Sequence, residues 1–299
     1  MKARHAVGRL NPGWLCQLPQ IPNKSTRLQS HQLGHRRLSY FSDGIVPLCP
    51  NGKIPWEGIR RSRSDTTLKK PDLPWGFSVY RCTYKDDKAW GRVLQQLQEA
   101  VQESLEEDAP ELIPHHQLVI NDDATKFDGA TSHEIRDHFN VWVEEQLQQV
   151  VISPEKLQMA MPERLQRTMP EELYPGPEYS FGARFNFALF VDDICLESLE
   201  HMSSPVVKIL YKQWGNLAPD ERNYQIHPDW HDGTIEMDEE DVGWMYMKTG
   251  EYVELYDKCE WSHLSIWHSF YLRPPQMDDQ LIESWGDRSE LPGFWRIKK

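Results

Sequence analysis

Residues 184–214 read RFNFALFVDDICLESLEHMSSPVVKILYKQW, and this stretch decides the expected fold. Its first part, Arg184–Val191, is rich in aromatic and apolar residues and has the length of a strand. Asp192–Asp193 then supply side chains that can cap a helix, which we expect to run to about Met202. A second apolar run, Val206–Trp214, predicts another strand. The stretch therefore predicts a strand, a helix and a strand in succession.

The same order occurs closer to the N-terminus. Trp75–Tyr84 (WGFSVYRCTY) is rich in aromatic and β-branched residues and predicts a strand. Asp86 and Asp87 follow it as N-cap candidates. The next apolar residues recur at spacings of three and four, which predicts an amphipathic helix ending before Pro110. These residues are Trp90, Val93, Leu94, Leu97, Val101 and Leu105.

A second long helix and further strands are expected in the rest of the chain. Gln117–Asn121 is a short strand candidate, and Thr131 with Glu134 three residues later forms a capping box that begins a helix. The apolar face of that helix consists of Ile135, Phe139, Trp142, Val143, Leu147 and Val150. Near the C-terminus, Gly243–Lys248 and Trp261–Leu272 are strand candidates.

Strands that alternate with helices, without a glycine-rich crossover turn, favour an α+β fold over a doubly wound sheet. We expect a ferredoxin-like or related sandwich of one sheet and its helices. It forms a single domain over residues 73–299, behind a basic and largely disordered leader and linker over residues 1–72.

Three segments of this body resemble a known group of sequences. They are Trp75–Arg81, the stretch Asp128–Thr131 leading into Phe139 and Trp142, and Arg184–Phe187. Over about residues 73–275 the chain resembles uncharacterised proteins of filamentous fungi. The resemblance implies one domain and a fungal source, and it implies no activity.

The leader and the body carry opposite charges. Residues 1–75 hold a net charge of +9 and the remainder −22, and the first acidic residue is Asp43. An arginine-rich, serine-containing and acid-free N-terminus is typical of a mitochondrial presequence, with Arg36–Ser42 as a processing region. Prolines at 12, 19 and 22 interrupt a long amphipathic helix, so a disordered tail or an upstream extension of the gene model stays open.

The composition bounds the compartment and the partners. Five cysteines, an odd number without a Cys-x-x-Cys motif, indicate reduced thiols in an intracellular compartment, either mitochondrial or cytoplasmic. No apolar run approaches the length of a membrane span, so we expect a soluble protein without a transmembrane segment. The acidic body repels phosphate, which argues against nucleic-acid binding through it.

The sequence from His133 to His138 (HEIRDH) comes close to a zinc-protease motif. That motif needs histidines four residues apart, on one helix face, to share a metal. Here the spacing is five residues, which places the imidazoles roughly 140° apart around a helix. A metalloprotease is therefore rejected, and we expect these histidines at the surface or at the start of the helix.

Residues 227–232 (HPDWHD) combine two imidazoles with two carboxylates in a long acidic loop. His227, His231, Asp229 and Asp232 are the candidate catalytic residues, although a solvated loop is the favoured interpretation of this segment. Two histidines fall short of the three or four ligands of a zinc site, so no metal is predicted. No nucleotide-binding or other cofactor motif occurs, and no cofactor is predicted.

Pairs of aspartates follow three of the predicted strands: Asp86/Asp87, Asp122/Asp123 and Asp192/Asp193. If those strands are neighbours, the carboxylates gather at one sheet edge, where they could bind Mg²⁺ or act as acid and base. The alternative is that each pair caps a helix or forms a turn.

Two functions are open at this point. The first is a non-catalytic binding or accessory protein that meets a protein partner through a C-terminal aromatic surface, formed by Trp244, Trp261, Trp267, Trp285 and Trp295. The alternative is a small-molecule enzyme on a ferredoxin-like sheet. It requires a pocket in which His116, His227, His231 or His268 lies beside a carboxylate.

Overall fold

A computed structural model describes residues 56–64, 73–151, 182–212, 242–260, 265–277 and 291–297. All of these belong to one compact unit, Pro47–Lys299. Residues 1–46, which include the predicted presequence, lie outside the described residues.

The described part of the chain contains one mixed sheet of five strands. The strands are β1 (Ser78–Arg81), β2 (Val119–Asn121), β3 (Phe187–Val191), β4 (Val206–Tyr211) and β5 (Trp244–Lys248). Their order is β2-β1-β3-β4-β5. β1 runs parallel to both β2 and β3, while β4 runs antiparallel to β3 and β5. The sheet therefore has a parallel half around β1 and an antiparallel half around β4.

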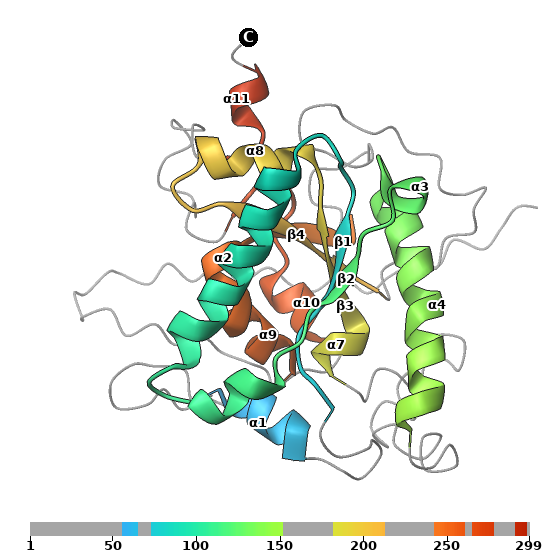
Figure 1. Cartoon of the computed structure of the whole chain (residues 1–299), viewed down its shortest axis with the longest axis vertical. Helices are drawn as coiled ribbons and strands as arrows, with labels where there is room; N and C mark the ends of the chain where they lie inside the picture. Colours follow the sequence, from blue (N-terminus) through green and yellow to red (C-terminus); the bar gives the residue numbers. More distant parts are fainter. Residues whose placement is uncertain are drawn as a thin grey trace, which may run out of the picture. The chain divides into compact units, whose positions relative to one another are not determined.

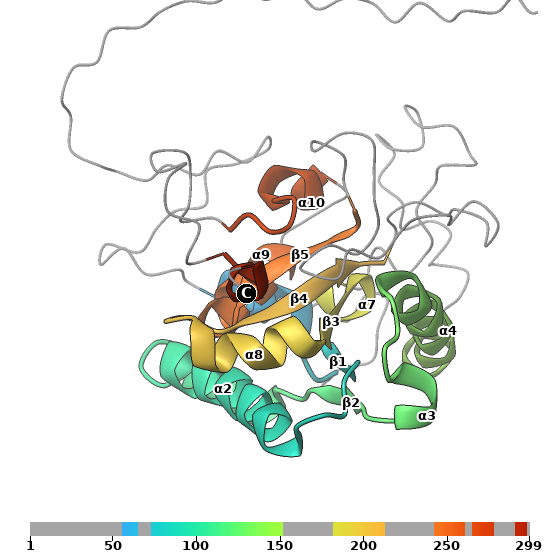
Figure 2. The ribbon, with the colours of Figure 1, turned by 90° about the horizontal axis from the view of Figure 1, so that it is seen from above.

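Helices cover both faces of this sheet (Figures 1 and 2). The longer helices are α2 (Asp87–Leu105), α4 (Ser132–Val150), α8 (Asp193–His201) and α9 (Tyr252–Glu260). The shorter ones are α1 (Glu57–Ser64), α3 (Ala124–Phe127), α7 (Ala183–Asn186), α10 (Ser265–Phe270) and α11 (Phe294–Ile297), with 3₁₀ turns η1 (Pro110–His115) and η4 (Thr249–Glu251). On one face α2 contacts both α8 and α9, and on the opposite face α4 packs against β3 and β4.

The core is accordingly split into two layers by the sheet. Val79 and Leu189 point toward the layer of α2, α8 and α9. Tyr80 and Phe190, their neighbours along the strands, point toward α4. Because both faces are covered, β1, β3 and β4 are buried along their whole length. This explains why their sequences are nearly continuous apolar runs.

The α+β class and the local signals for three helices are confirmed. The side chain of Asp86 caps α2, and that of Asp192 caps α8. Thr131 and Glu134 form the expected capping box at the start of α4. The ferredoxin-like arrangement is not confirmed, because the connections through α2 and α4 cross on opposite faces of a parallel β2-β1-β3 unit.

Two strand predictions are wrong in part. Arg184 belongs to the helical turn α7, and β3 begins only at Phe187. Within Trp261–Leu272 the structure shows a helix, α10, whose Trp267 packs against Phe187. A short aromatic run cannot distinguish a buried strand from a buried helical turn, because both bury every side chain.

The expected linker contains an element of the body. α1 lies within residues 1–72, yet it packs on α9 and its Ile59 is fully buried. The Ile59 amide donates a 2.9 Å hydrogen bond to the buried Asp257 carboxylate. The prediction of a structureless linker is therefore wrong for Glu57–Ser64.

The first prediction tests whether α1 is part of the folded body. Replacement of Ile59 by Ala should lower the free energy of unfolding by about 2–4 kcal/mol, because it leaves a cavity between α1 and α9. Urea denaturation measures this loss, with Glu57→Ala, an exposed change in the same helix, as the control. Equal stability of the two variants would show that α1 contributes nothing to the core.

A second prediction concerns the close approach of the chain segments that lead into β1 and β2. Gly76 has a φ of +124°, and a Cβ atom there would lie 2.7 Å from the Gln117 carbonyl oxygen. Gly76→Ala should therefore cost more than 2 kcal/mol, roughly the range of backbone strain plus a steric shift. Gly91→Ala on the open surface of α2 should instead stabilise by about 0.5–1 kcal/mol. Thermal unfolding of both variants measures this opposite response.

Candidate functional site

The carboxyl ends of β1, β2 and β3 lie at one edge of the sheet, and the three aspartate pairs follow them. The connection that leaves β1 covers one face through α2, and the connection that leaves the adjacent β2 covers the other face through α4. In open α/β sheets, ligands bind where the connections diverge in this way. This edge is therefore the candidate site.

Arg81 joins two of the aspartate pairs. Its side chain is only 7% exposed, and its guanidinium forms ion pairs with Asp87 and, at 3.4 Å, with Asp122. The rings of Tyr84 and Trp90 lie 4.3 and 5.6 Å from its central carbon. Burial alone would lower the pKa of Arg81, but the two carboxylates raise it overall. Asp87 and Asp122 therefore meet on one guanidinium, while one aspartate of each pair caps a helix: Asp86, Asp123 and Asp192.

Asp192, from the third pair, forms a buried ion pair with Lys208. The Lys208 Nζ lies 2.7 Å from the Asp192 carboxylate, and the lysine side chain is 4% exposed. The rings of Trp244, Phe190 and Tyr246 surround the ammonium at 4.1, 5.3 and 5.5 Å. Burial opposes both charges, yet their attraction lowers the pKa of Asp192 and raises that of Lys208. Both groups are therefore charged at neutral pH.

Asp192 also holds the start of α8. Its other carboxylate oxygen accepts a 3.2 Å hydrogen bond from the Cys195 amide, which is the helix cap. The Cys195 thiol is buried, and burial together with the nearby Asp192 charge raises its pKa. A protonated, buried thiol is a poor nucleophile, so Cys195 has a structural role.

A cleft of about 240 Å³ opens between α2 and α8 at this edge. It is lined by Lys85, Asp86, Ala89, Arg92, Asp193, Leu196, Glu197 and Glu200. The three acids of α8 follow at spacings of four and three, so they share one helix face. Each pairs with a cation from a different segment: Lys85 before α2, Arg296 in α11 and Arg92 in α2.

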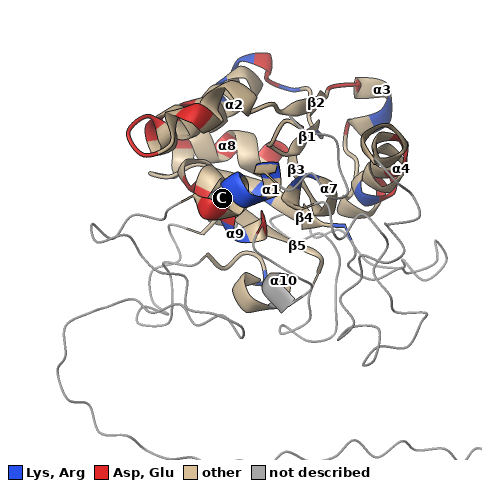
Figure 3. Ribbon diagram, turned by 90° about the horizontal axis from the view of Figure 1, so that it is seen from below, with Lys and Arg blue, Asp and Glu red and all other residues tan. Residues whose placement is uncertain are grey.

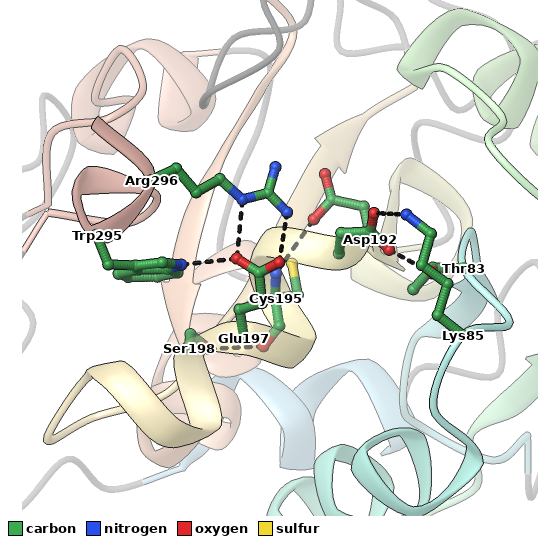
Figure 4. Close-up of polar contacts among 9 residues, drawn as sticks. Thr83, Lys85, Asp192, Cys195, Glu197, Ser198, Trp295 and Arg296 are labelled. Carbon is green, nitrogen blue, oxygen red and sulfur yellow. Dashed lines mark hydrogen bonds and ion pairs between the residues drawn. The ribbon is translucent and has the colours of Figure 1, made fainter. Parts of the chain in front are cut away.

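Glu197 binds the C-terminal helix α11 to α8 (Figure 4). Its carboxylate accepts hydrogen bonds from Trp295 Nε1 at 2.7 Å and from Arg296 Nε and Nη2 at 2.8 and 2.9 Å. The Trp295 ring also stacks on His201, with 4.9 Å between centroids and 17° between planes. Burial would raise the pKa of Glu197, but the Arg296 and Trp295 donors lower it. α11 is thus fixed beside the cleft.

Five ionisable groups at this edge have shifted pKa values. Asp192 and Glu197 have lowered pKa values, while those of Lys208, Cys195 and Arg81 are raised. Each shift moves the group away from neutrality, whereas a general acid or base works best with a pKa near the operating pH. Among the described residues, no group of three or more His, Cys, Asp or Glu side chains could hold a metal ion.

The catalytic candidates of residues 227–232 lie outside the described part of the chain, as does the side chain of His268. His116 is described, and its Nε2 lies 3.0 Å from the Tyr252 hydroxyl. Burial and the nearby Arg184 charge lower the pKa of His116 to about 4. Among the described residues, the hydrogen-bond partner of the His116 ring is the Tyr252 hydroxyl and not a carboxylate.

His133 and His138 have separate surroundings. His133 lies at the start of α4, as expected, and is buried with its Nδ1 3.3 Å from Arg136. It turns inward because α4 packs its first turn against the sheet. His138 is half-buried, and its Nδ1 lies 3.1 Å from the Tyr80 hydroxyl.

Two tryptophans of the expected C-terminal aromatic surface are buried and do not belong to any surface. Trp244 is fully buried under the α4 layer and Trp267 is buried in the other layer. Trp295 contacts α8, and Trp261 and Trp285 lie outside the described residues. Trp244 and Trp267 are core residues because the sheet between them needs large side chains on both faces.

Two residues of the site were missed from the sequence. Lys208 is the single charged residue in the apolar run VVKILY, and a lone charge in a buried strand signals a buried partner. Arg81 similarly ends an apolar strand. Their partners could not be assigned, because Asp192 and Asp122 belong to other segments.

None of the helices in the described part of the chain is long and apolar enough to cross a membrane.

Comparison of the chain with protein-family models, with curated proteins and with solved structures finds no match. The resemblance to uncharacterised fungal proteins therefore stays a prediction.

The buried ion pair generates a third prediction. Asp192→Asn should lower the free energy of unfolding by about 3–5 kcal/mol, because it leaves the Lys208 ammonium buried without its counter-charge. Chemical denaturation at pH 7 measures this loss. Glu200→Gln, in an exposed pair, should cost about 1 kcal/mol or less.

The same pair should also contribute to the pH dependence of stability. Because the folded pKa of Asp192 lies below its unfolded value, its contribution is present above about pH 4 and is lost as the pH falls through the folded pKa. The stability difference between wild type and Asp192→Asn should therefore shrink in acid. A difference independent of pH would contradict an ionised Asp192.

Proposed function

We propose that this chain is a non-catalytic binding protein, and that the α2–α8 cleft receives a basic side chain of a protein partner. The observation that carries the proposal is the row of acids on α8, Asp193, Glu197 and Glu200, which lines the cleft between α2 and α8. A non-catalytic role agrees with groups whose pKa values are shifted away from neutrality.

The size of the cleft favours a side chain over a whole ligand. Small-molecule pockets commonly enclose about 300–1,000 Å³, and this cleft has about 240 Å³. One or two side chains of an approaching protein fit that volume. A partner segment is therefore a better occupant than a cofactor or a drug-sized molecule.

The charge of the cleft favours a cation. Its lining holds four carboxylates and two basic groups. Acidic residues also recur along α2 and α4 (Figure 3). An arginine or lysine entering the cleft would therefore be attracted by the surrounding field.

The existing ion pairs across the cleft can be exchanged. The side chains of Lys85 and Asp193 are 76% and 30% exposed, and those of Arg92 and Glu200 are 49% and 66% exposed. The Asp193 carboxylate also accepts a hydrogen bond from the Thr83 hydroxyl. Exposed pairs of this kind contribute about 0–1 kcal/mol, so an incoming guanidinium can replace Lys85 or Arg92 at little cost. Glu197 is different, because three hydrogen bonds from α11 hold it. The exchangeable carboxylates are therefore Asp193 and Glu200.

The alternative of a small-molecule enzyme with a histidine–carboxylate pair receives no support from His116, whose described ring partner is Tyr252. His227 and His231 lie outside the described residues, so the alternative rests on the sequence alone.

The fourth prediction tests the cleft with labelled peptides of twelve residues that carry two arginines, each compared with the same peptide carrying citrulline. At about 150 mM salt the arginine peptides should bind, and the doubly changed Asp193→Asn/Glu200→Gln should bind roughly tenfold more weakly, about 1.4 kcal/mol. Fluorescence anisotropy measures both affinities.

The control removes the same two charges elsewhere on the acidic body. Glu103→Gln/Glu106→Gln lies on the exposed end of α2, away from the cleft. If this control loses as much affinity as the cleft variant, the binding is non-specific attraction to an acidic surface. Equal binding of arginine and citrulline peptides would also refute the proposal.

A further inference from the structure

At the opposite, amino-terminal edge of the parallel strands lies a buried guanidinium. Arg184 sits in α7, directly before β3, and only 8% of the residue is exposed. Its Nη1 donates hydrogen bonds to the carbonyl oxygens of Gly76 at 2.8 Å and Gln117 at 2.9 Å. These two residues precede β1 and β2, so Arg184 joins the entrances of the three strands.

The two hydrogen bonds use both hydrogens of Nη1. A guanidinium carries five N–H donors, so the Nε and Nη2 atoms retain three more. In the described part of the chain, no acceptor lies within hydrogen-bond distance of these three. Nε and Nη2 are also absent from the set of described side-chain atoms that are both buried and without a hydrogen-bond partner. Both atoms are therefore accessible to solvent. The Nε–Nη2 side of Arg184 is therefore unused and reachable.

No negative charge balances Arg184 within the described residues. The Glu260 carboxylate lies beside the neighbouring Gly182, but it is not among the groups that shift the pKa of Arg184. Tyr252 and Tyr256 lie close, and burial raises their pKa values, so both hydroxyls are neutral. A buried charge normally has a counter-charge, because desolvation otherwise costs several kcal/mol, on the order of the stability of a domain.

We propose that Arg184 forms the anchor of a binding site for a small monocarboxylate, held side-on by its Nε and Nη2 atoms. Two parallel N–H donors match the two oxygens of a carboxylate, which is the strongest arrangement available to arginine. One negative charge neutralises one buried cation, whereas a dianionic phosphate or sulfate would leave a buried excess. The site lies at the edge opposite to the α2–α8 cleft, and it does not depend on the function proposed for that cleft.

The surroundings favour a carboxylate with a flat apolar body. The Trp142 ring lies 6.0 Å from the guanidinium carbon and stacks parallel to Phe185. The His116 ring is neutral at pH 7 because of its low pKa, so it neither repels Arg184 nor competes for the anion. Benzoate is therefore the probe, with acetate as the smaller carboxylate.

The competing explanation is that Arg184 has a structural role only, in which its hydrogen bonds connect the segments that precede the strands. Arg136 provides a matched control, because it is also buried and also donates to two carbonyl oxygens, those of Tyr211 and Gly243. Arg184→Met and Arg136→Met each remove two hydrogen bonds from a buried guanidinium to carbonyl oxygens. Only Arg184→Met removes the proposed site.

The fifth prediction is tested by isothermal titration and thermal unfolding with sodium benzoate at constant ionic strength. Wild type should bind one benzoate per chain, and its Tm should rise by about 3–6 °C at ten times Kd. Arg184→Lys, which keeps the charge without the fork, should bind at least tenfold more weakly. Arg184→Met should not bind, and Arg136→Met should retain wild-type affinity within about twofold.

Each outcome decides the inference. A wild type that shows no saturable response to benzoate or acetate overturns it, even if Arg184→Met fails to fold. An affinity for sulfate equal to the affinity for benzoate also overturns it, because it would indicate a general anion site. Loss of benzoate binding in Arg136→Met would assign the effect to destabilisation and also overturn it.

Discussion

β1 is hydrogen-bonded in parallel to β2 on one side and to β3 on the other, and this pairing constrains the arrangement around it. A parallel neighbour can be reached only by a connection that returns over a face of the sheet. Because β2 and β3 lie on opposite sides of β1, the two returns cover opposite faces, one through α2 and the other through α4. Both faces are therefore buried, and the strands need apolar side chains on both.

The same pairing gives the two edges of the parallel half different chemistry. At the carboxyl edge, an aspartate pair follows each strand, and Asp87, Asp193 and Asp192 form ion pairs with Arg81, Lys85 and Lys208. These charges are balanced across elements, and their attraction lowers the pKa of Asp192 and raises the pKa values of Arg81, Lys85 and Lys208. At the amino edge, the three entrances meet on Arg184, where a buried cation contacts carbonyl oxygens. One edge is suited to an exchange of ion pairs and the other to an anion.

Local signals predicted much of the secondary structure. The cap at Asp86, the capping box at Thr131 and the cap at Asp192 act within four residues, so their helices could be placed from the sequence. α10 and the short α7 could not be placed, because their aromatic side chains are buried by segments far away in the chain. α1 was missed because its eight residues include one buried apolar side chain, Ile59, which leaves almost no periodic pattern.

The candidate site was likewise predictable from the sequence only in part. The sequence shows that an aspartate pair follows each of three strands. It predicts that the pairs lie close together on the condition that the strands are neighbours in the sheet. Whether they meet depends on strand order, which is set by packing of both faces at once. The cation between Asp87 and Asp122, the aromatic rings around Lys208 and the three donors on Glu197 all come from separate segments.

By itself, the sequence determined where helices begin, which runs are buried, and that the body is acidic behind a basic leader. These properties depend on neighbouring residues or on composition. Only the tertiary structure decided the order β2-β1-β3-β4-β5, the burial of Trp244 and Trp267, and the position of Arg184 between two strand entrances. The physical reason is that a contact between distant segments depends on the relative placement of whole elements, which no local pattern records.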